Sequence, residues 1–132
     1  MKGVASKIAS RPLDILIIRP YFTVLDWEKA RPIMANFVKK TATEGRMVFY
    51  GWDINGDKLH CRESYRDGDA ANSHLANIAS DIGELLAEGV ATMDSITIHG
   101  PAAELEKVKP GTQEFGTCHI CVQLYGYVGI PV

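Results

Sequence analysis

The chain has 132 residues, a length that suits one domain, and its 46% hydrophobic content is enough for a core of ordinary size. Charged residues make up 23% and leave a net charge of −2, without the clustered basic excess that binds nucleic acid. The apolar run Ile15 to Ile18 is far too short to span a bilayer, and no apolar run precedes Leu13 as a secretory signal requires. We therefore expect a cytoplasmic protein without a membrane or nucleic-acid partner.

Three cysteines, Cys61, Cys118 and Cys121, cannot all pair within one chain, and without an export signal we expect free thiols. The run Cys118-His119-Ile120-Cys121 has the spacing of half a zinc site. A structural zinc site needs four ligands, and the sequence has no second paired motif. In a strand the two thiols would also point to opposite faces. We expect no metal here, and a redox pair is only slightly better supported than zinc.

The first strand is expected from Leu13 to Val24, where the middle is rich in β-branched residues. Pro20 cannot donate to a ladder, so it predicts a strand end, an edge or a bulge. A strand that is apolar on both faces is covered on both faces. Both alternating sets are apolar here: Leu13, Ile15, Ile17 and Tyr21, against Leu16, Ile18, Phe22 and Val24.

A helix is expected from Asp26 to Glu44, with Asp26 as its N-cap and Gly45 just past its C-terminus. A rotation of 100° per residue gathers its apolar side chains on one arc and leaves Asn36 on the opposite one. Pro32 lies beyond the first turn, so the regular helix either starts near Pro32 or is distorted there.

A β-hairpin is expected around Asn55-Gly56, the pair favoured in two-residue type I′ turns. That turn predicts that Trp52 lies opposite Leu59, and alternation then sorts the side chains into two faces. The sequence does not decide which face meets the helices. One face carries Val48, Tyr50, Trp52, Leu59, Cys61, Glu63 and Tyr65, and the other carries Met47, Phe49, Gly51, His60, Arg62 and Ser64.

A second helix is expected after Asp67 or Asp69. A capping signature at Ser80, Asp81 and Glu84 predicts that this helix breaks near residue 80. The remaining predicted elements are a strand from Ser95 to His99, a short helix from Ala102 to Val108 and a strand from Cys118 to Tyr125.

The order β-α-β-β-α-β predicts an α+β, ferredoxin-like protein with a four-stranded antiparallel sheet. Two helices cover one face of such a sheet, and the first strand indicates that the other face is apolar too. A monomer rarely exposes so large an apolar face, so we expect a homodimer. We divide the chain into a flexible N-terminal arm (residues 1–12), a ferredoxin-like domain (13–109) and a C-terminal extension with an added strand (110–132).

Short segments in a particular order add to this pattern. They are a helix ending in Thr41-Ala-Thr-Glu44-Gly45, a strand with Phe49-Tyr50, the run Glu63-Ser-Tyr65-Arg-Asp, a helix with His74-Leu75 and the run Ser95-Ile-Thr-Ile-His-Gly100. Together they resemble the antibiotic biosynthesis monooxygenase-type domain of the dimeric α+β barrel superfamily, over roughly residues 14–108.

The resemblance implies a homodimer whose two sheets close into a barrel, with a pocket between sheet and helices in each subunit. Some relatives oxidise aromatic polyketides or quinols with O₂ and without metal or flavin, others degrade haem, and many have no known activity. Haem-degrading relatives carry a histidine near the end of the second helix, whereas His74 lies near its start. Quinone-forming relatives surround the substrate with residue types that are also present here, as Trp52, Asn36, Tyr50 and Arg62.

Two side chains are candidates for proton transfer. Glu63 shares a hairpin face with three aromatic residues, where burial would raise the pKa of its carboxyl and suit it to act as a general base. His74 borders the apolar stripe of its helix and could take a proton near neutral pH. Each has a structural alternative, in which it only locks helix to sheet by hydrogen bonding. That alternative is slightly favoured for His74 and evenly balanced for Glu63.

The leading hypothesis is a cofactor-independent monooxygenase that acts on quinols or aromatic polyketide-like small molecules. Glu63 and His74 are its catalytic candidates, no cofactor is expected, and the substrate-binding candidates are Asn36, Tyr50, Trp52 and Tyr65. The alternative is a non-catalytic small-ligand-binding or structural homodimer of the same fold, in which the aromatic residues are core. Haem degradation comes third.

Overall fold

The computed structural model describes residues 15–126, so the arm predicted for residues 1–12 lies outside the described range. The predicted helices and strands occur in the predicted order, with ends that differ by a few residues, and the structure adds one 3₁₀ turn before the last strand. They are β1 (Leu16–Val24), α2 (Trp27–Thr41), β2 (Met47–Asn55), β3 (Lys58–Tyr65), α3 (Gly68–Asn77), α4 (Ala79–Leu85), β4 (Ala91–Gly100), α5 (Ala102–Thr112), the 3₁₀ turn η1 (Gln113–Phe115) and β5 (Cys118–Val122).

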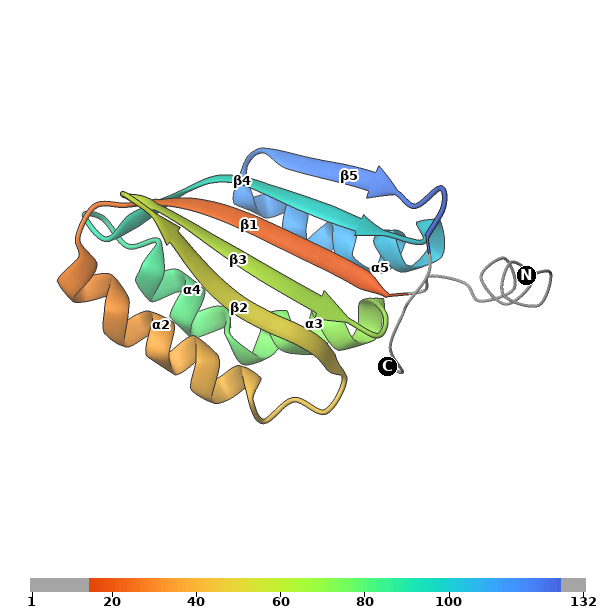
Figure 1. Ribbon diagram of the computed structural model, residues 1–132, viewed down its shortest axis with the longest axis horizontal. Coiled ribbons are helices and arrows are strands. Elements are labelled where there is room, and N and C mark those ends of the chain that lie inside the picture. Colours follow the sequence, from red (N-terminus) through yellow and green to blue (C-terminus); the bar gives the residue numbers. More distant parts are fainter. Residues whose placement is uncertain (1–14, 127–132) are drawn as a thin grey trace, which may run out of the picture.

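The strands form one mixed sheet in the order β2-β3-β1-β4-β5 (Figure 1). Neighbours among the first four strands pair antiparallel, which is compatible with a ferredoxin-like fold, whereas β5 pairs parallel to β4. The sheet is therefore five-stranded and mixed, and not the four-stranded antiparallel sheet that was predicted. The helix α5 carries the chain back along the sheet after β4, and such a crossover joins parallel neighbours.

The helices gather on one side of the sheet (Figure 1). One alternating set of β1 faces them and is buried, including Leu16, Ile18 and Phe22. The other set faces the open side, with Ile17 and Tyr21 half-buried and Arg19 exposed. The core is thus one layer between sheet and helices. No helix of the described residues is long and apolar enough to cross a membrane.

Pro20 lies inside β1, the central strand of the sheet, rather than at a strand end. It sits opposite Ile96 of β4, and the register of this pair shifts between Tyr21 and Phe22. The missing N–H of Pro20 predicted a strand end, an edge or a bulge, and Pro20 lies beside a bulge.

The hairpin turn lies one residue later than predicted. Asn55 pairs with Lys58, so Gly56 and Asp57 form the loop, and Trp52 lies opposite Cys61 instead of Leu59. Gly56 has φ +63°, and no non-glycine residue of the described chain has a positive φ. A positive φ at the first central residue alone is typical of a type II′ turn, whereas type I′ requires it at both. Compared with the prediction, each β2 residue lies opposite a β3 residue two positions further along the chain. A shift of two residues preserves alternation, so the side chains keep their predicted faces except at a second irregularity, between Met47 and Phe49.

Asp26 caps α2 as predicted, with its carboxylate accepting a hydrogen bond from the Lys29 backbone N–H at 3.2 Å. The helix passes through Pro32 and ends at Thr41, so Gly45 is not its C′ residue.

The predicted break of the second helix falls at Ile78, between α3 and α4. Asp81 does not take part in a cap, because α4 has no side-chain cap. Its buried carboxylate instead pairs with the Lys40 ammonium at 2.6 Å and joins α4 to α2.

Candidate active site

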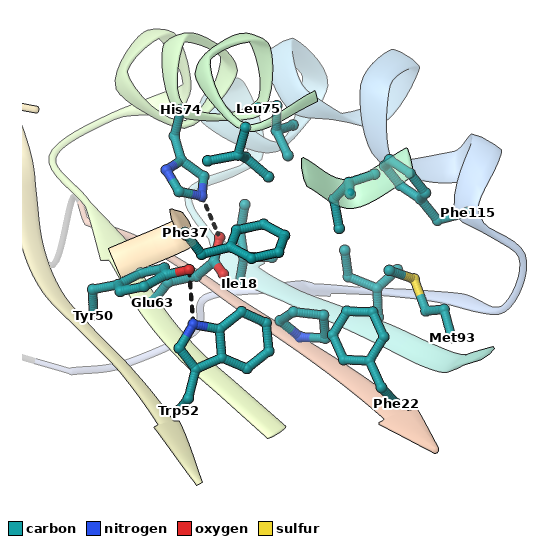
Figure 2. Close-up of a pocket in the computed structure, with 14 residues that line it drawn as sticks. Ile18, Phe22, Phe37, Tyr50, Trp52, Glu63, His74, Leu75, Met93 and Phe115 are labelled. Carbon is teal, nitrogen blue, oxygen red and sulfur yellow. Dashed lines mark hydrogen bonds and ion pairs between the residues drawn. The ribbon is translucent and has the colours of Figure 1, made fainter. Parts of the chain in front are cut away.

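A pocket lies between sheet and helices, on the hairpin face that carries Tyr50, Trp52 and Glu63 (Figure 2). The fold thereby decides which hairpin face meets the helices. Most lining side chains are apolar, and His74 of α3 enters from the helix side. The cavity is small, with a volume of about 30 Å³.

Glu63 of β3 is buried and holds both carboxyl oxygens against donors. The Tyr65 hydroxyl donates to Oε1, and the Cys61 thiol donates to Oε2 at 3.0 Å. Nε2 of His74 lies 3.8 Å from Oε1. Burial raises the pKa of the Glu63 carboxyl above its ordinary value, and this outweighs the opposing effects of His74 and the two donors. The carboxyl is therefore a proton acceptor of unusual strength for its type.

His74 is fully buried, at 1% exposure, and lies between two carboxylates. Its Nδ1 is 2.9 Å from Oε2 of Glu44, in the loop after α2, while its Nε2 faces Glu63. The rings of Tyr50 and Tyr65 pack against the imidazole, with centroids 5.7 and 5.3 Å away. Glu44 also accepts a hydrogen bond from the Asn77 side-chain amide at 2.9 Å. Helix α3 is thus tied to the loop after α2 and to the sheet.

Tyr50 and Trp52 form a polar edge on the aromatic wall of the pocket. The indole Nε1–H of Trp52 donates to the Tyr50 hydroxyl at 3.0 Å, and the Trp52 ring packs on Phe37 with centroids 5.4 Å apart (Figure 2). Burial raises the pKa of Tyr50 well above its ordinary value, with nearby Cys61 and Glu63 acting in the same direction. Tyr50 therefore keeps its proton and can act as a hydrogen-bond donor.

Four of the six predicted site residues line one pocket: Glu63, His74, Tyr50 and Trp52. Tyr65 lies beneath the pocket, fully buried, and contacts Glu63 instead of the cavity.

The position of Asn36 does not support its prediction as a substrate-binding residue. It is exposed on α2 and does not line the pocket, because it occupies the helix face opposite the apolar arc.

Arg62, mentioned with the quinone-forming relatives, points to the open side of the sheet and pairs with Asp53 at 2.6 Å.

The sequence reasoning missed Glu44 as a site residue. It follows α2, where the negative end of the helix dipole disfavours a carboxylate, and an acid at such a position signals a specific partner. That partner, His74, is 30 residues away in the sequence and is recognised only in the folded chain.

Cys118 and Cys121, which have the spacing of half a zinc site, are unpaired, and so is Cys61. This confirms the expectation of free thiols. Cys118 lies beside Ile96 and faces the helices, so alternation turns Cys121 to the open side. Within residues 15–126 no three His, Cys, Asp or Glu side chains are grouped closely enough to hold a metal ion.

The fold and site together define a small α+β domain with a buried acid–histidine pair in an apolar pocket. Solved structures with this fold include MupZ from Pseudomonas fluorescens, with 28% sequence identity, a TM-score of 0.79 and coverage of 89% of this chain and 91% of that one. No family model and no curated protein matches the sequence.

Two further solved structures share the fold at lower identity. SnoaB, a cofactor-independent oxygenase from Streptomyces nogalater, is 16% identical with a TM-score of 0.57, covering 64% of this chain and 90% of SnoaB. A Deinococcus radiodurans protein assigned as an antibiotic biosynthesis monooxygenase is 19% identical with a TM-score of 0.52, covering 62% and 88%. The chain therefore has the fold of the antibiotic biosynthesis monooxygenase-type proteins, as the sequence resemblance predicted.

Proposed function

We propose that this protein is a cofactor-independent monooxygenase that removes a proton from a small, mostly apolar molecule bound in the pocket. The observation that carries the proposal is the Glu63 carboxyl, buried in an apolar pocket with its pKa raised. The shared fold with a cofactor-independent oxygenase supports the reaction class.

The substrate class is an aromatic molecule with an acidic C–H or O–H group, such as an anthrone or a quinol. Loss of a proton converts it to an electron-rich anion that can pass electrons to O₂. For an anthrone-type CH₂ group, one oxygen atom becomes the product carbonyl and the other leaves as water with the two hydrogens. The protein supplies a base, a donor for the anion and a dry site.

Each polar residue of the pocket has a part in this proposal. Glu63 takes the proton from the substrate, and the neighbouring His74 can then receive it from Glu63. Tyr50, held by the indole of Trp52, donates a hydrogen bond to the oxygen anion of the substrate. The half-buried side chains Trp52, Met93 and Phe115 move to admit a ring, because a cavity of about 30 Å³ is too small to hold one.

The experiment is oxygen uptake with a panel of anthrones and dihydroxynaphthalenes, without added flavin or metal. Consumption of substrate should match consumption of O₂. Glu63→Gln should lower kcat by about 100-fold or more, the usual contribution of a general base, in protein that still unfolds cooperatively. The matched control is Glu106→Gln, since Glu106 is a glutamate of α5 that lies outside the pocket and pairs with Lys109.

A second candidate is a non-catalytic ligand-binding or structural role for the same pocket. It is favoured by the two donors that already occupy the Glu63 oxygens and by the small cavity. Substrate analogues that bind without any O₂ uptake by the wild-type protein would support it. A Soret band on haem titration, lost in His74→Ala, would instead support haem chemistry.

A homodimer is part of the proposal. The open side of the sheet carries Ile17 and Tyr21, both half-buried, and the exposed Phe49. A second copy covering this face would remove that apolar surface from water. Three unpaired cysteines further support a reducing compartment such as the cytoplasm.

A further inference from the structure

Glu44, His74 and Glu63 lie in a row that runs from the protein surface to the pocket. Oε2 of Glu44 is 2.9 Å from Nδ1 of His74, and Nε2 of the same ring is 3.8 Å from Oε1 of Glu63. The two carboxylates therefore lie at opposite edges of one imidazole ring. The proposed function uses Glu63 and His74, and it leaves the role of Glu44 open.

The two ends of the row have different surroundings. The Glu63 side chain is 6% exposed and lines the pocket, whereas that of Glu44 is 15% exposed. Glu44 borders a separate surface recess of about 150 Å³, together with Arg46 and Ser73. The residues that line this recess are not among those that line the pocket. Glu44 thus meets solvent away from the substrate.

The contacts of Glu44 fix the tautomer of His74. Both contacts of its Oε2 are to nitrogen atoms, from the Asn77 amide at 2.9 Å and from the His74 ring. An ionised carboxylate only accepts hydrogen bonds, so the ring must place its N–H on Nδ1. In the neutral ring this leaves the lone pair on Nε2, directed at Glu63.

We propose that Glu44, His74 and Glu63 act as one proton-holding triad, in which Glu44 fixes the Nδ1–H tautomer so that Nε2 of His74 takes the proton that Glu63 removes. The inference rests on the proposed function and deepens it. Glu44 is a positioning residue, because it acts through His74 and does not reach the pocket.

The proton balance is simple. The substrate O–H or C–H bond breaks, and its proton moves to a Glu63 oxygen. It then passes to Nε2 of His74, which becomes an imidazolium between two carboxylates, and Glu63 regains its charge. The same proton returns by the same two atoms when water forms from the second oxygen atom of O₂. No electron passes through the triad.

The groups that face the triad suit this exchange. Tyr65 and Cys61 donate to Glu63, and Tyr50 and Tyr65 pack against the imidazole. Moving the proton between Glu63 and His74 leaves the net charge of the buried group unchanged. The 3.8 Å gap is at ion-pair range, and catalytic hydrogen bonds often shorten only when substrate binds.

The first test reads the tautomer directly and needs no substrate. Ring ¹⁵N spectra of histidine-labelled wild-type protein should show neutral His74 as the Nδ1–H tautomer, with its signal assigned by its loss in His74→Asn. Glu44→Ala should lose this preference, whereas the control Glu106→Ala, at an exposed glutamate of α5 that pairs with Lys109, should keep it. Finding the Nε2–H tautomer in the wild type would overturn the proposal, even if no variant folds.

The second test uses turnover. Glu44→Ala should lower kcat at least tenfold with KM within about twofold, and formate added to fill the vacated recess should restore part of the loss. A merely structural role would lower Tm without rescue by formate, and that result would also overturn the proposal. If the wild type turns over no member of the panel, the oxygenase proposal fails, whereas the tautomer result still decides the arrangement of the triad.

Discussion

At the scale of single residues, the surroundings of Glu63 determine its chemistry more than its residue type does. A surface glutamate would be ionised and unremarkable, but Glu63 is buried beneath helices with Tyr65, Cys61 and His74 around it. Its raised pKa follows from the lost hydration of the charged form. Removal of this residue should therefore affect the pH dependence of stability as well as activity.

Glu63→Gln should change how stability varies with pH. Because burial raises the folded-state pKa of Glu63 above its ordinary value of 4.5, the folded protein holds this proton more tightly than the unfolded chain. The contribution of the group to the free energy of unfolding is full below pH 4.5 and is lost as pH rises through the folded-state pKa. Urea unfolding across pH should show the variant gaining relative to wild type as pH rises, by about 1.4 kcal/mol per unit of raised pKa. A difference that is constant with pH would contradict the assignment.

Tyr65→Phe should raise the pKa of Glu63 further. The Tyr65 hydroxyl donates to the carboxylate, so it favours the charged form, and its loss favours the protonated form. The stability cost should be about 1–3 kcal/mol, the usual effect of leaving a buried acceptor short of a partner. Carbon-detected NMR titration of the glutamate carboxyls measures the shift. Tyr21→Phe on the open side is the control and should leave the Glu63 titration in place.

At the scale of elements, the helices hold the site through their contacts with one another. The start of α3 lies against α5, where the backbone N–H of Gly68 donates to Glu104 at 3.2 Å. The pair Lys40–Asp81 joins α2 to α4, and Asn77 donates to the Lys40 carbonyl at 3.1 Å. These contacts fix where α3 presents His74 to the sheet.

Gly68→Ala and Gly83→Ala should have opposite effects although both replace a helix glycine. A Cβ at Gly68 would lie 2.8 Å from the Glu104 carbonyl oxygen and 2.9 Å from Lys107 Cβ, so α3 and α5 must separate. We expect a loss of about 1–3 kcal/mol, the usual cost of overpacking. At Gly83 nothing lies within 4 Å, and alanine should stabilise α4 by about 0.5–1 kcal/mol. Chemical denaturation measures both, and equal effects would show that α3 and α5 do not pack this tightly.

At the scale of the whole molecule, the helices found within residues 15–126 lie on one side of the sheet and leave its other side open (Figure 1). The open side mixes Ile17, Tyr21 and Phe49 with Arg19 and Arg62. This is the face that the proposed homodimer would cover.

Phe49→Glu should therefore weaken self-association. Sedimentation of the wild type at micromolar concentration should give about twice the 14.5 kDa chain mass. Phe49 is 43% exposed in the single chain, so a charge there should disturb folding little but oppose burial against a partner. Val38→Glu, at a 51% exposed position of α2, is the control and should remain dimeric. A wild-type monomer with cooperative unfolding would remove the dimer proposal.

The sequence by itself determined the local elements, because their signals lie within a few residues. Alternation placed Glu63 on the same hairpin face as Tyr50 and Trp52, a capping aspartate located the start of α2, and the odd number of cysteines predicted free thiols. Helical periodicity also placed Asn36 away from the apolar arc, although it was chosen as a site residue by analogy with relatives.

The tertiary structure alone decided the long-range relations. The turn at Gly56 set the hairpin register, and the packing of helices on one side selected the face that lines the pocket. The contact between Glu44 and His74 joins residues 30 positions apart. Periodicity describes which side of an element a residue occupies, but not which element that side meets. That choice depends on packing energies summed over the whole core, which no short stretch of sequence contains.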